Sequence, residues 1–283
     1  MPRGARLASC PGIKRRRRAV IASLLVLSLA PIDLGHLAWA KGKTRATAKS
    51  STPKPVPPRC DRSKFRIVLD VGHTAEAPGA KSARNVGEFE FNLHLARRIE
   101  ERLKSEGFVQ TSVLVTEGKA KPSLFKRVAA VNKSRVNLFL SIHHDSVPDD
   151  FLEDWEFEGK TNHFSDRFGG YSVFVSRKNP QFTASLKFAR LLGNQMAAQD
   201  LQFARQYDQL FMGRYQRQLL DFNAGVYRHD HLVVLERARM AAVLLEAGSI
   251  INRDEELVVA SPEHQGKVST AVAGAVQQFC ESR

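Results

Sequence analysis

The sequence of 283 residues lacks the short motifs that mark several large enzyme classes. It has no Gly-rich phosphate-binding loop, no Gly-x-Ser-x-Gly motif and no Cys-x-x-Cys pair. Such motifs hold nucleotide phosphates, catalytic serines and reactive thiols, respectively. Nucleotide binding and catalysis by a serine or cysteine nucleophile therefore gain little support from the sequence.

The N-terminal segment has no apolar run long enough to cross a bilayer comfortably. Residues 19–30 form a twelve-residue apolar run, whereas a membrane-spanning helix needs roughly 20 residues. The run follows the basic residues 14–18 and precedes small residues at 38–40, at the usual cleavage spacing. We therefore predict that residues 1–40 are a secretory signal peptide, with no stable transmembrane span after cleavage. An uncleaved anchor is the alternative, and the export route stays open.

Acidic residues are scarce only in the first part of the chain. The formal net charge is +14, but residues 1–40 contribute +6 and residues 41–64 contribute +7. Residues 65–283 are thus nearly neutral, which argues against a nucleic-acid partner. Residues 41–64 are rich in Lys, Thr, Ser, Ala and Pro, and they predict a basic disordered linker. One folded domain is expected over residues 65–283.

Cysteine is rare, with three in the chain. Cys10 would leave with the signal peptide, and Cys60 and Cys280 would remain on the two sides of the folded domain. In an oxidising compartment this pair could form a disulfide that ties the two ends together. A disulfide requires alpha carbons within about 7 Å, which a sequence cannot show, so the pairing stays open.

Short apolar runs alternate with helical patterns from Phe65 onward. In the helix expected over 86–108, apolar residues recur at helical spacing and Gly107 is placed to cap the end. The expected strands are 65–71, 109–116, 137–144, 171–176 and 241–248. The other expected helices are 123–134, 181–200, parts of 203–222, and 262–281. This alternation favours a single α/β domain whose mostly parallel sheet is covered by helices on both faces.

Three polar residues, His73, His143 and Glu246, each come directly after an apolar run. If these runs are parallel strands, the three side chains gather at one edge of the sheet, where ligands bind in such folds. Glu88 begins the helix after the first strand and can face the same edge. Two histidines and a carboxylate form a common catalytic zinc site, and a second carboxylate can take a proton from water.

Histidines at strand ends are also commonly structural, so these residue types alone leave the metal site open. The histidines at other positions are expected to lie on the surface or to form hydrogen bonds rather than to bind metal. This expectation applies to His94, His163, His229 and His231.

Five segments in order carry a more specific signal. They are IVLDVGHTAEAPGA (67–80), GEFEFNLHLA (87–96), LFKRVAAVN (124–132), LFLSIHHDS (138–146) and VLLEAGSIINRDEE (243–256). In this order and spacing they resemble the zinc-dependent N-acetylmuramoyl-L-alanine amidases of the amidase-3 type, over about residues 65–279. The resemblance implies a twisted mixed sheet of about six strands, flanked by helices.

The resemblance also implies an activity and the residues that perform it. His73, Glu88 and His143 would bind Zn²⁺, and Glu246 would serve as general base and later as the acid for the leaving amine. The substrate would be peptidoglycan, cut between the lactyl group of N-acetylmuramic acid and L-alanine, in the periplasm or cell envelope. Two alternatives remain: a zinc amidohydrolase or carboxypeptidase for small acyl-amino acids or peptides, and a non-catalytic wall-binding domain.

The sequence departs from the family pattern at some positions. His144 stands where the family often has a small residue, and residues 247–249 replace the usual Thr-Gly-Phe. We expect His144, Arg127 and Asn252 either to contact the metal ligands without binding the metal themselves, or to contact substrate. Glu90 is a rival of Glu88, but two residues along a helix its side chain should point away.

Two insertions also stand out, at 147–170 and 201–230. The first carries six acids around three aromatic residues, and the second is rich in Tyr, Phe, Arg and Gln. Both are expected to be loops on the rim of the site. Because some members of the family close the site with a helix that an activator protein displaces, either insertion could instead be an autoinhibitory gate, with its acids reaching the metal.

Overall fold

The structure of the chain is a computed structural model that describes residues 60–283. The predicted signal peptide, residues 1–40, and residues 41–59 of the predicted linker lie outside the described residues. The last residues of that linker are described: they include the short 3-10 helix η1 (Arg62–Lys64). Cys60 is joined to Cys280, with alpha carbons 5.3 Å apart. The disulfide therefore closes the domain at its two ends.

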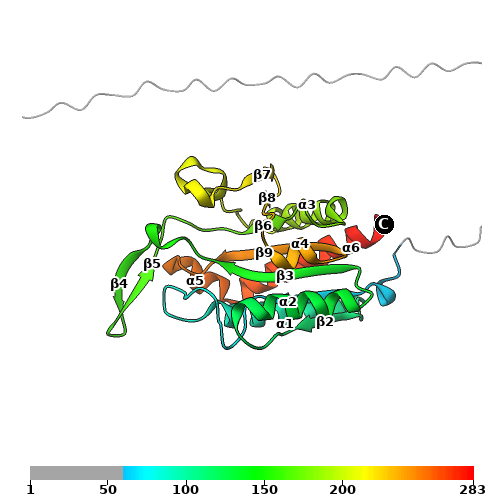
Figure 1. Cartoon of the computed structure of the whole chain (residues 1–283), viewed down its shortest axis with the longest axis horizontal. Helices are drawn as coiled ribbons and strands as arrows, with labels where there is room; N and C mark the ends of the chain where they lie inside the picture. Colours follow the sequence, from blue (N-terminus) through cyan, green and yellow to red (C-terminus); the bar gives the residue numbers. More distant parts are fainter. Residues whose placement is uncertain (1–59) are drawn as a thin grey trace, which may run out of the picture. The chain divides into compact units, whose positions relative to one another are not determined.

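A seven-stranded mixed sheet forms the centre of the domain, in the order β2-β1-β3-β9-β6-β8-β7 (Figure 1). The strands are β1 (Ile67–Val71), β2 (Thr111–Leu114), β3 (Leu138–Asp145), β6 (Ser172–Val175), β7 (Gln218–Asp221), β8 (Val226–Arg228) and β9 (Ala241–Ser249). Strands β2, β1, β3 and β9 are parallel to one another. β6 runs antiparallel to β9, β8 parallel to β6, and β7 antiparallel to β8. The predicted α/β domain with a mostly parallel, mixed sheet is confirmed.

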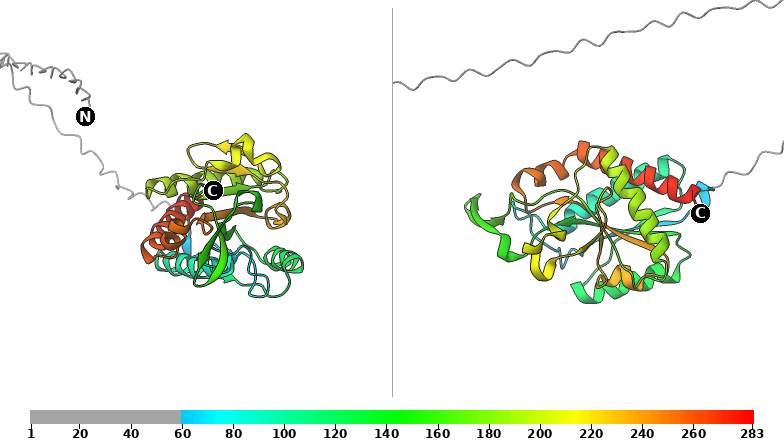
Figure 2. Two further views of the ribbon diagram at one scale, coloured as in Figure 1. Left: turned by 90° about the vertical axis from the view of Figure 1, so that its left-hand side faces the viewer. Right: turned by 90° about the horizontal axis from the view of Figure 1, so that it is seen from above.

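Helices cover both faces of this sheet, as the left view of Figure 2 shows for α6 and α2. One face packs against α1 (Glu88–Ser105), α3 (Phe182–Ala198) and α6 (Pro262–Glu281). The other face packs against α2 (Ala120–Lys133) and the short α4 (Val233–Arg237). Leu95, Ile99 and Leu103 of α1 are fully buried, at the four-residue spacing that places them on one side of a helix. Burial of such apolar stripes explains why the longer predicted elements are confirmed.

The prediction that parts of 203–222 are helical is confirmed only as short 3-10 helices, not as an α-helix. That segment contains the 3-10 helices η3 (Gln206–Asp208) and η4 (Leu210–Tyr215), followed by β7. Leu210 and Phe211 are 87% and 50% exposed, and Gly213 has a φ of 51°. The segment therefore has no continuous apolar face for an α-helix to bury.

The first insertion folds into a β-hairpin that protrudes from the domain at the left of Figure 1. It comprises η2 (Asp149–Phe151), β4 (Glu153–Phe157) and β5 (Lys160–Phe164). Its turn residues Glu158 and Gly159 have φ of 51° and 69°, as tight two-residue hairpins require. The short α5 (Arg253–Val259) follows β9 nearby. None of the helices in residues 60–283 is long and apolar enough to span a membrane.

Candidate active site

Three donor side chains converge beyond the carboxyl ends of β1 and β3. His73 follows β1 by two residues, Glu88 is the first residue of α1, and His143 lies near the end of β3. Nε2 of His73 lies 2.9 Å from Oε2 of Glu88, and Nδ1 of His143 lies 2.9 Å from Oε1. Their ligand atoms all lie within 4.8 Å of one another, as a metal site requires. Glu90 is exposed and stands outside this cluster.

Two glycines make room for the cluster. A Cβ atom on Gly72 would lie 2.4–2.6 Å from ring atoms of His143. A Cβ atom on Gly79, which has a φ of 80°, would lie 2.6 Å from Oε2 of Glu88 and 2.7 Å from the His73 ring. Real side chains do not tolerate such contacts, so both positions need glycine for the donors to approach one another.

Glu88 is held as an anion although it is only 4% exposed. Burial by itself would raise the pKa of Glu88, but hydrogen bonds from His143 and His73 outweigh it and hold the pKa well below its usual range. Asn92 Nδ2 donates to Oε1 at 3.0 Å, and the backbone N–H of His144 does so at 3.3 Å. A buried carboxylate with this set of donors is prepared to bind a cation.

Arg127 lies behind His73 rather than in an open groove, and it is 1% exposed. Its Nη1 donates to the Asp70 carboxylate at 3.1 and 3.2 Å and to the Val71 carbonyl, while Nη2 donates to the His73 carbonyl at 2.7 Å. The Ser141 hydroxyl donates to Asp70 at 2.7 Å. This buried network fixes the backbone of His73, whose φ of 67° is rarely adopted by residues other than glycine.

The other two residues predicted to support the ligands or contact substrate also bond to the protein itself. Nδ1 of His144 lies 2.9 Å from Oδ1 of Asn92, and burial lowers the pKa of His144 to about 3, so the ring is neutral at pH 7. Asn92 in turn contacts Glu88. Asn252 caps α5 by accepting from the N–H groups of Asp254 and Glu255.

Glu246 lies beside the cluster on the neighbouring strand. In the β3–β9 register it is paired directly with His143. Its Oε2 atom is buried and has no hydrogen-bond partner. Burial, followed by the nearby charges of Asp145 and Glu88, raises the pKa of Glu246 well above its usual value. This oxygen thus accepts no hydrogen bond from the protein, and the carboxyl group lies next to the candidate metal site.

Sequence patterns did not indicate Asp145 and Tyr207, which adjoin Glu246. The Tyr207 hydroxyl donates to both Asp145 oxygens, at 2.6 and 2.7 Å. Tyr207 belongs to η3 in the second insertion, 62 residues further along the chain. The contact joins the site to a segment whose helical parts are only short 3-10 helices.

Comparison with known proteins agrees with this geometry. Residues 67–278 match the Amidase_3 family, described as N-acetylmuramoyl-L-alanine amidase. The chain belongs to this family. The N-acetylmuramoyl-L-alanine amidases AmiC of Neisseria meningitidis and Escherichia coli are 24% and 23% identical over 82% and 85% of the chain. The chain spans only 56% and 59% of their lengths, and 35% of a Buchnera aphidicola relative that is 34% identical over 83 residues.

Solved structures in the comparison share the fold. The N-acetylmuramyl-L-alanine amidase Ami1 of Mycobacterium smegmatis superposes with a TM-score of 0.59 at 20% identity, covering 78% of this chain and 98% of that one. The catalytic domain of CwlV from Paenibacillus polymyxa gives 0.56 at 24% identity, covering 77% and 99%. The family domain is therefore present nearly in full.

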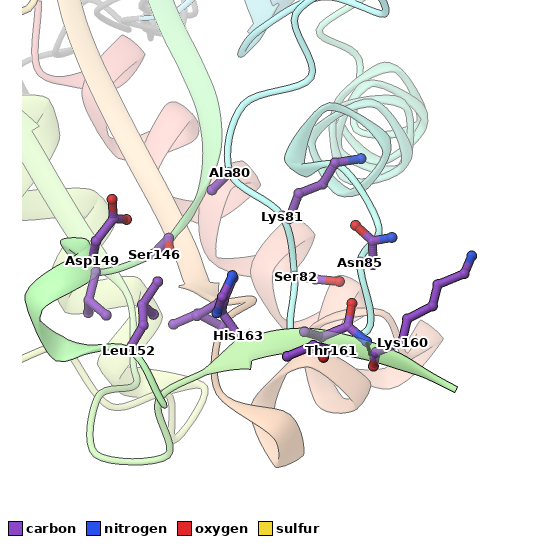
Figure 3. Close-up of a pocket in the computed structure, with 13 residues that line it drawn as sticks. Ala80, Lys81, Ser82, Asn85, Ser146, Asp149, Leu152, Lys160, Thr161 and His163 are labelled. Atoms are coloured by element: carbon purple, nitrogen blue, oxygen red, sulfur yellow. Dashed lines mark hydrogen bonds between the residues drawn. The ribbon is translucent and has the colours of Figure 1, made fainter. Parts of the chain in front are cut away.

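A cavity of about 510 Å³ lies between the hairpin and the loop before α1. Lys81, Ser82 and Asn85 line it from the loop, and Lys160 and Thr161 line it from β5 (Figure 3). Ala80 and Ser146 also line it. The backbone N–H of Ala80 donates to the Glu88 carboxylate, and that of Ser146 donates to the Asp145 carboxylate. The hairpin of this family member thus forms a wall of the groove beside the candidate metal site.

The acids of the first insertion do not reach the metal cluster. All six are exposed, and none belongs to the group formed by His73, Glu88 and His143. They are Asp149, Asp150, Glu153, Asp154, Glu156 and Glu158. The observation that motivated an autoinhibitory gate in this insertion is therefore absent from the structure, and an activator protein stays a prediction.

The remaining histidines also stand outside the metal cluster. His94 is exposed, and Nδ1 of His163 lies 2.8 Å from Asp154 on the hairpin. His229 and His231 line a surface cavity near β7 and β8. That none of these four histidines is a ligand stays a prediction.

Proposed function

We propose that the chain hydrolyses the amide bond between the lactyl group of N-acetylmuramic acid and the L-alanine of the peptidoglycan stem peptide. The observation that carries the proposal is the convergence of His73, Glu88 and His143, with Glu246 in register beside His143. Membership of the family over residues 67–278 supports the choice of bond and substrate.

The donor set fits a zinc ion. Two imidazole nitrogens and one carboxylate oxygen are a common set of protein ligands for catalytic Zn²⁺, which keeps a further position open. The buried negative charge of Glu88 would balance part of the charge of the ion. Bound by His73, Glu88 and His143, Zn²⁺ would polarise the scissile carbonyl group and lower the pKa of a water molecule towards about 7.

The protein's own residues would position the reactants and move the proton. Glu246 accepts a proton from the attacking water through its unpartnered oxygen, and later delivers it to the nitrogen of the leaving L-alanine. Arg127 and Asp70 fix the backbone that presents His73. Asn92 and His144 keep the Glu88 carboxylate oriented.

The proposed place of action is outside the cytoplasm. The family acts on cell wall, and the disulfide between Cys60 and Cys280 suits an oxidising compartment. Export by the predicted signal peptide over residues 1–40 would deliver the domain to the periplasm or cell envelope.

Mass analysis of products released from purified sacculi tests the proposal. Stem peptides that begin with free L-alanine, together with glycan strands lacking peptide, are expected, and a chelator should abolish their release. Cleavage only within the peptide would instead identify a carboxypeptidase. Binding to sacculi without any release, in metal-loaded protein, would identify a wall-binding domain.

A further inference from the structure

Two cavities on the β7–β8 side of Glu246 share Arg217 and His229. The inner cavity, of about 290 Å³, is lined by Glu246, Tyr207 and Phe174 as well as by the shared pair. The outer cavity, of about 520 Å³, is lined by the shared pair and by Arg214, Arg228 and His231. The two cavities are therefore neighbours, with Arg217 and His229 lining both, and we refer to the pair as the channel.

The walls of the outer cavity carry an excess of positive charge. Three arginines, Arg214, Arg217 and Arg228, face a single aspartate, Asp230, which is already paired with Arg228. Neither Arg214 nor Arg217 has a carboxylate within 4.0 Å in residues 60–283. Burial, then the nearby Arg217 charge, lowers the pKa of His229 to about 4, which reflects the same positive surroundings.

Arg217 is held ready for a ligand. It is half-buried, and its Nη1 donates to the backbone carbonyls of Arg214 and Gln216, at 3.2 and 2.9 Å. Its own N–H donates to the Tyr207 carbonyl at 2.6 Å. The guanidinium group is thus anchored to the same segment that contacts Asp145 through Tyr207. A guanidinium group in a fixed position is well suited to bind a carboxylate through paired hydrogen bonds.

The inner end of the channel holds a second unpartnered group. Glu246 lines it, and the Oε2 atom of Glu246 is buried without a hydrogen-bond partner. Because Arg217 lines the same cavity, a substrate whose scissile bond lies at Glu246 can place one of its two halves beside Arg217. The two halves of the proposed substrate differ in charge. The lactyl carboxyl group of the glycan half is consumed in the amide bond, whereas the peptide half ends in a carboxylate.

We propose that the channel is the peptide subsite and that Arg217 binds a carboxylate of the stem peptide, which makes Arg217 a specificity-determining residue. This inference rests on the proposed function. Charge complementarity favours this channel over the cavity beside the hairpin. That cavity offers Lys81 and Lys160, but Asp149 also lines it, so its excess of positive charge is smaller than that of the outer cavity. The glycan half would then lie on the hairpin side.

Hydrolysis of a matched pair of small substrates tests this assignment. The pair is N-acetylmuramoyl-L-alanyl-D-glutamate as the free acid and the same compound with both carboxyl groups converted to carboxamides. Arg217→Gln should raise KM for the acid about tenfold, because a charge-assisted hydrogen bond is lost, and should affect the carboxamide far less. Arg217→Lys, which keeps the charge, should recover part of the loss. A merely structural role would lower kcat and the melting temperature and would affect both substrates equally.

Two further variants each remove one positive charge elsewhere. Lys160→Gln changes the cavity beside the hairpin, and Arg97→Gln changes an exposed position on α1. Both should leave the ratio of KM values for acid and carboxamide within about twofold of the wild type. If Lys160→Gln changes the ratio and Arg217→Gln does not, the peptide lies on the hairpin side and the proposal is overturned.

A binding measurement separates this inference from the proposed function. L-Alanyl-D-glutamate and its diamide are titrated into the full chain by calorimetry, without any turnover. The diacid should bind at least about tenfold more tightly than the diamide, and Arg217→Gln should remove the difference. If wild-type protein binds in this way but fails to hydrolyse the muramoyl substrates, only the proposed function fails. If it hydrolyses both muramoyl substrates but neither ratio depends on Arg217, only the peptide subsite fails.

Discussion

The ends of the central strands and the insertions around them form two unlike walls of one site. The inner wall consists of His73, Glu88, His143 and Glu246, which come from β1, α1, β3 and β9 and rest on the buried core. The outer wall consists of the hairpin 153–164 and the segment 206–230. The hairpin carries exposed and mostly acidic residues, whereas the outer cavity beside β7 and β8 is lined by three arginines and one aspartate.

We therefore expect the inner wall to perform the chemistry and the outer wall to determine substrate preference. His73, Glu88 and His143 bond to one another and Glu246 lies beside them, so a change in one of these residues is expected to affect metal binding or the chemical step. Outer residues stand outside the metal cluster, so changes there are expected to alter substrate preference. Tyr207 is the exception, because it belongs to the outer wall but bonds to the buried Asp145.

The largest expected effect comes from removing an inner-wall donor. His143→Ala removes one of the three donor side chains of the cluster. It also removes the imidazole nitrogen that lies 2.9 Å from the Glu88 carboxylate. We expect loss of bound zinc and a fall in hydrolysis of at least about 10³-fold. Elemental analysis beside a rate assay checks both, and a variant that keeps its metal would remove His143 from the ligand set.

Removing the disulfide tests whether a change at the far end of the domain lowers stability without changing the rate of hydrolysis. Replacing Cys60 and Cys280 together by serine should lower the free energy of unfolding by about 2–5 kcal/mol. Rates of hydrolysis at 25 °C should stay within about twofold, because the bond is remote from the inner wall. Urea titration gives the stability, and an unchanged midpoint would show that the bond does not form in solution.

A single methyl group on the inner wall should weaken metal binding. In Gly72→Ala the new Cβ would lie 2.4–2.6 Å from the His143 ring, which must then move. We expect zinc affinity to fall by roughly 10–100-fold, as for other changes that misplace a ligand. Gly266→Ala on α6 is the matched control, because its Cβ would meet no atom within 4 Å. Equal zinc affinity in the two variants, measured against a competing chelator, would contradict the account.

The smallest expected effect lies at the contact between the two walls. Tyr207→Phe leaves the buried Asp145 carboxylate without its hydroxyl donor and should cost about 1–3 kcal/mol of stability. Tyr215→Phe is the control, because the Tyr215 hydroxyl accepts only from the exposed Arg214. Thermal unfolding of both variants decides: similar midpoints would mean that the Tyr207 contact adds nothing.

The fold was predictable where apolar periodicity reports burial. The long helices α1, α3 and α6 and the strands β1, β3 and β9 follow from such patterns, and the predicted and observed bounds agree closely. The strands β7 and β8 are short and partly polar, and in η4 Leu210 and Phe211 are exposed while Met212 is buried. Their positions depend on tertiary contacts, which is why the sequence indicated helical parts within 203–222 but neither the two short 3-10 helices nor these strands.

The candidate site divides in the same way. His73, His143 and Glu246 follow apolar runs, so their convergence could be inferred from the rule that parallel strands share one carboxyl edge. Family motifs drew attention to Arg127, Asn252 and His144 but left their contacts open. The neighbours of Glu246 could not be inferred, because the Tyr207–Asp145 bond joins residues 62 positions apart that no motif links.

The central claim is that three residues hold the metal while Glu246 only moves the proton. The most direct test is zinc content measured together with the rate of amide hydrolysis for Glu246→Gln. The account predicts one zinc per chain, as in the wild type, and a rate lower by about 10²–10⁴-fold. A variant that hydrolyses its substrate at the wild-type rate, or that has lost its zinc, would contradict this division of roles.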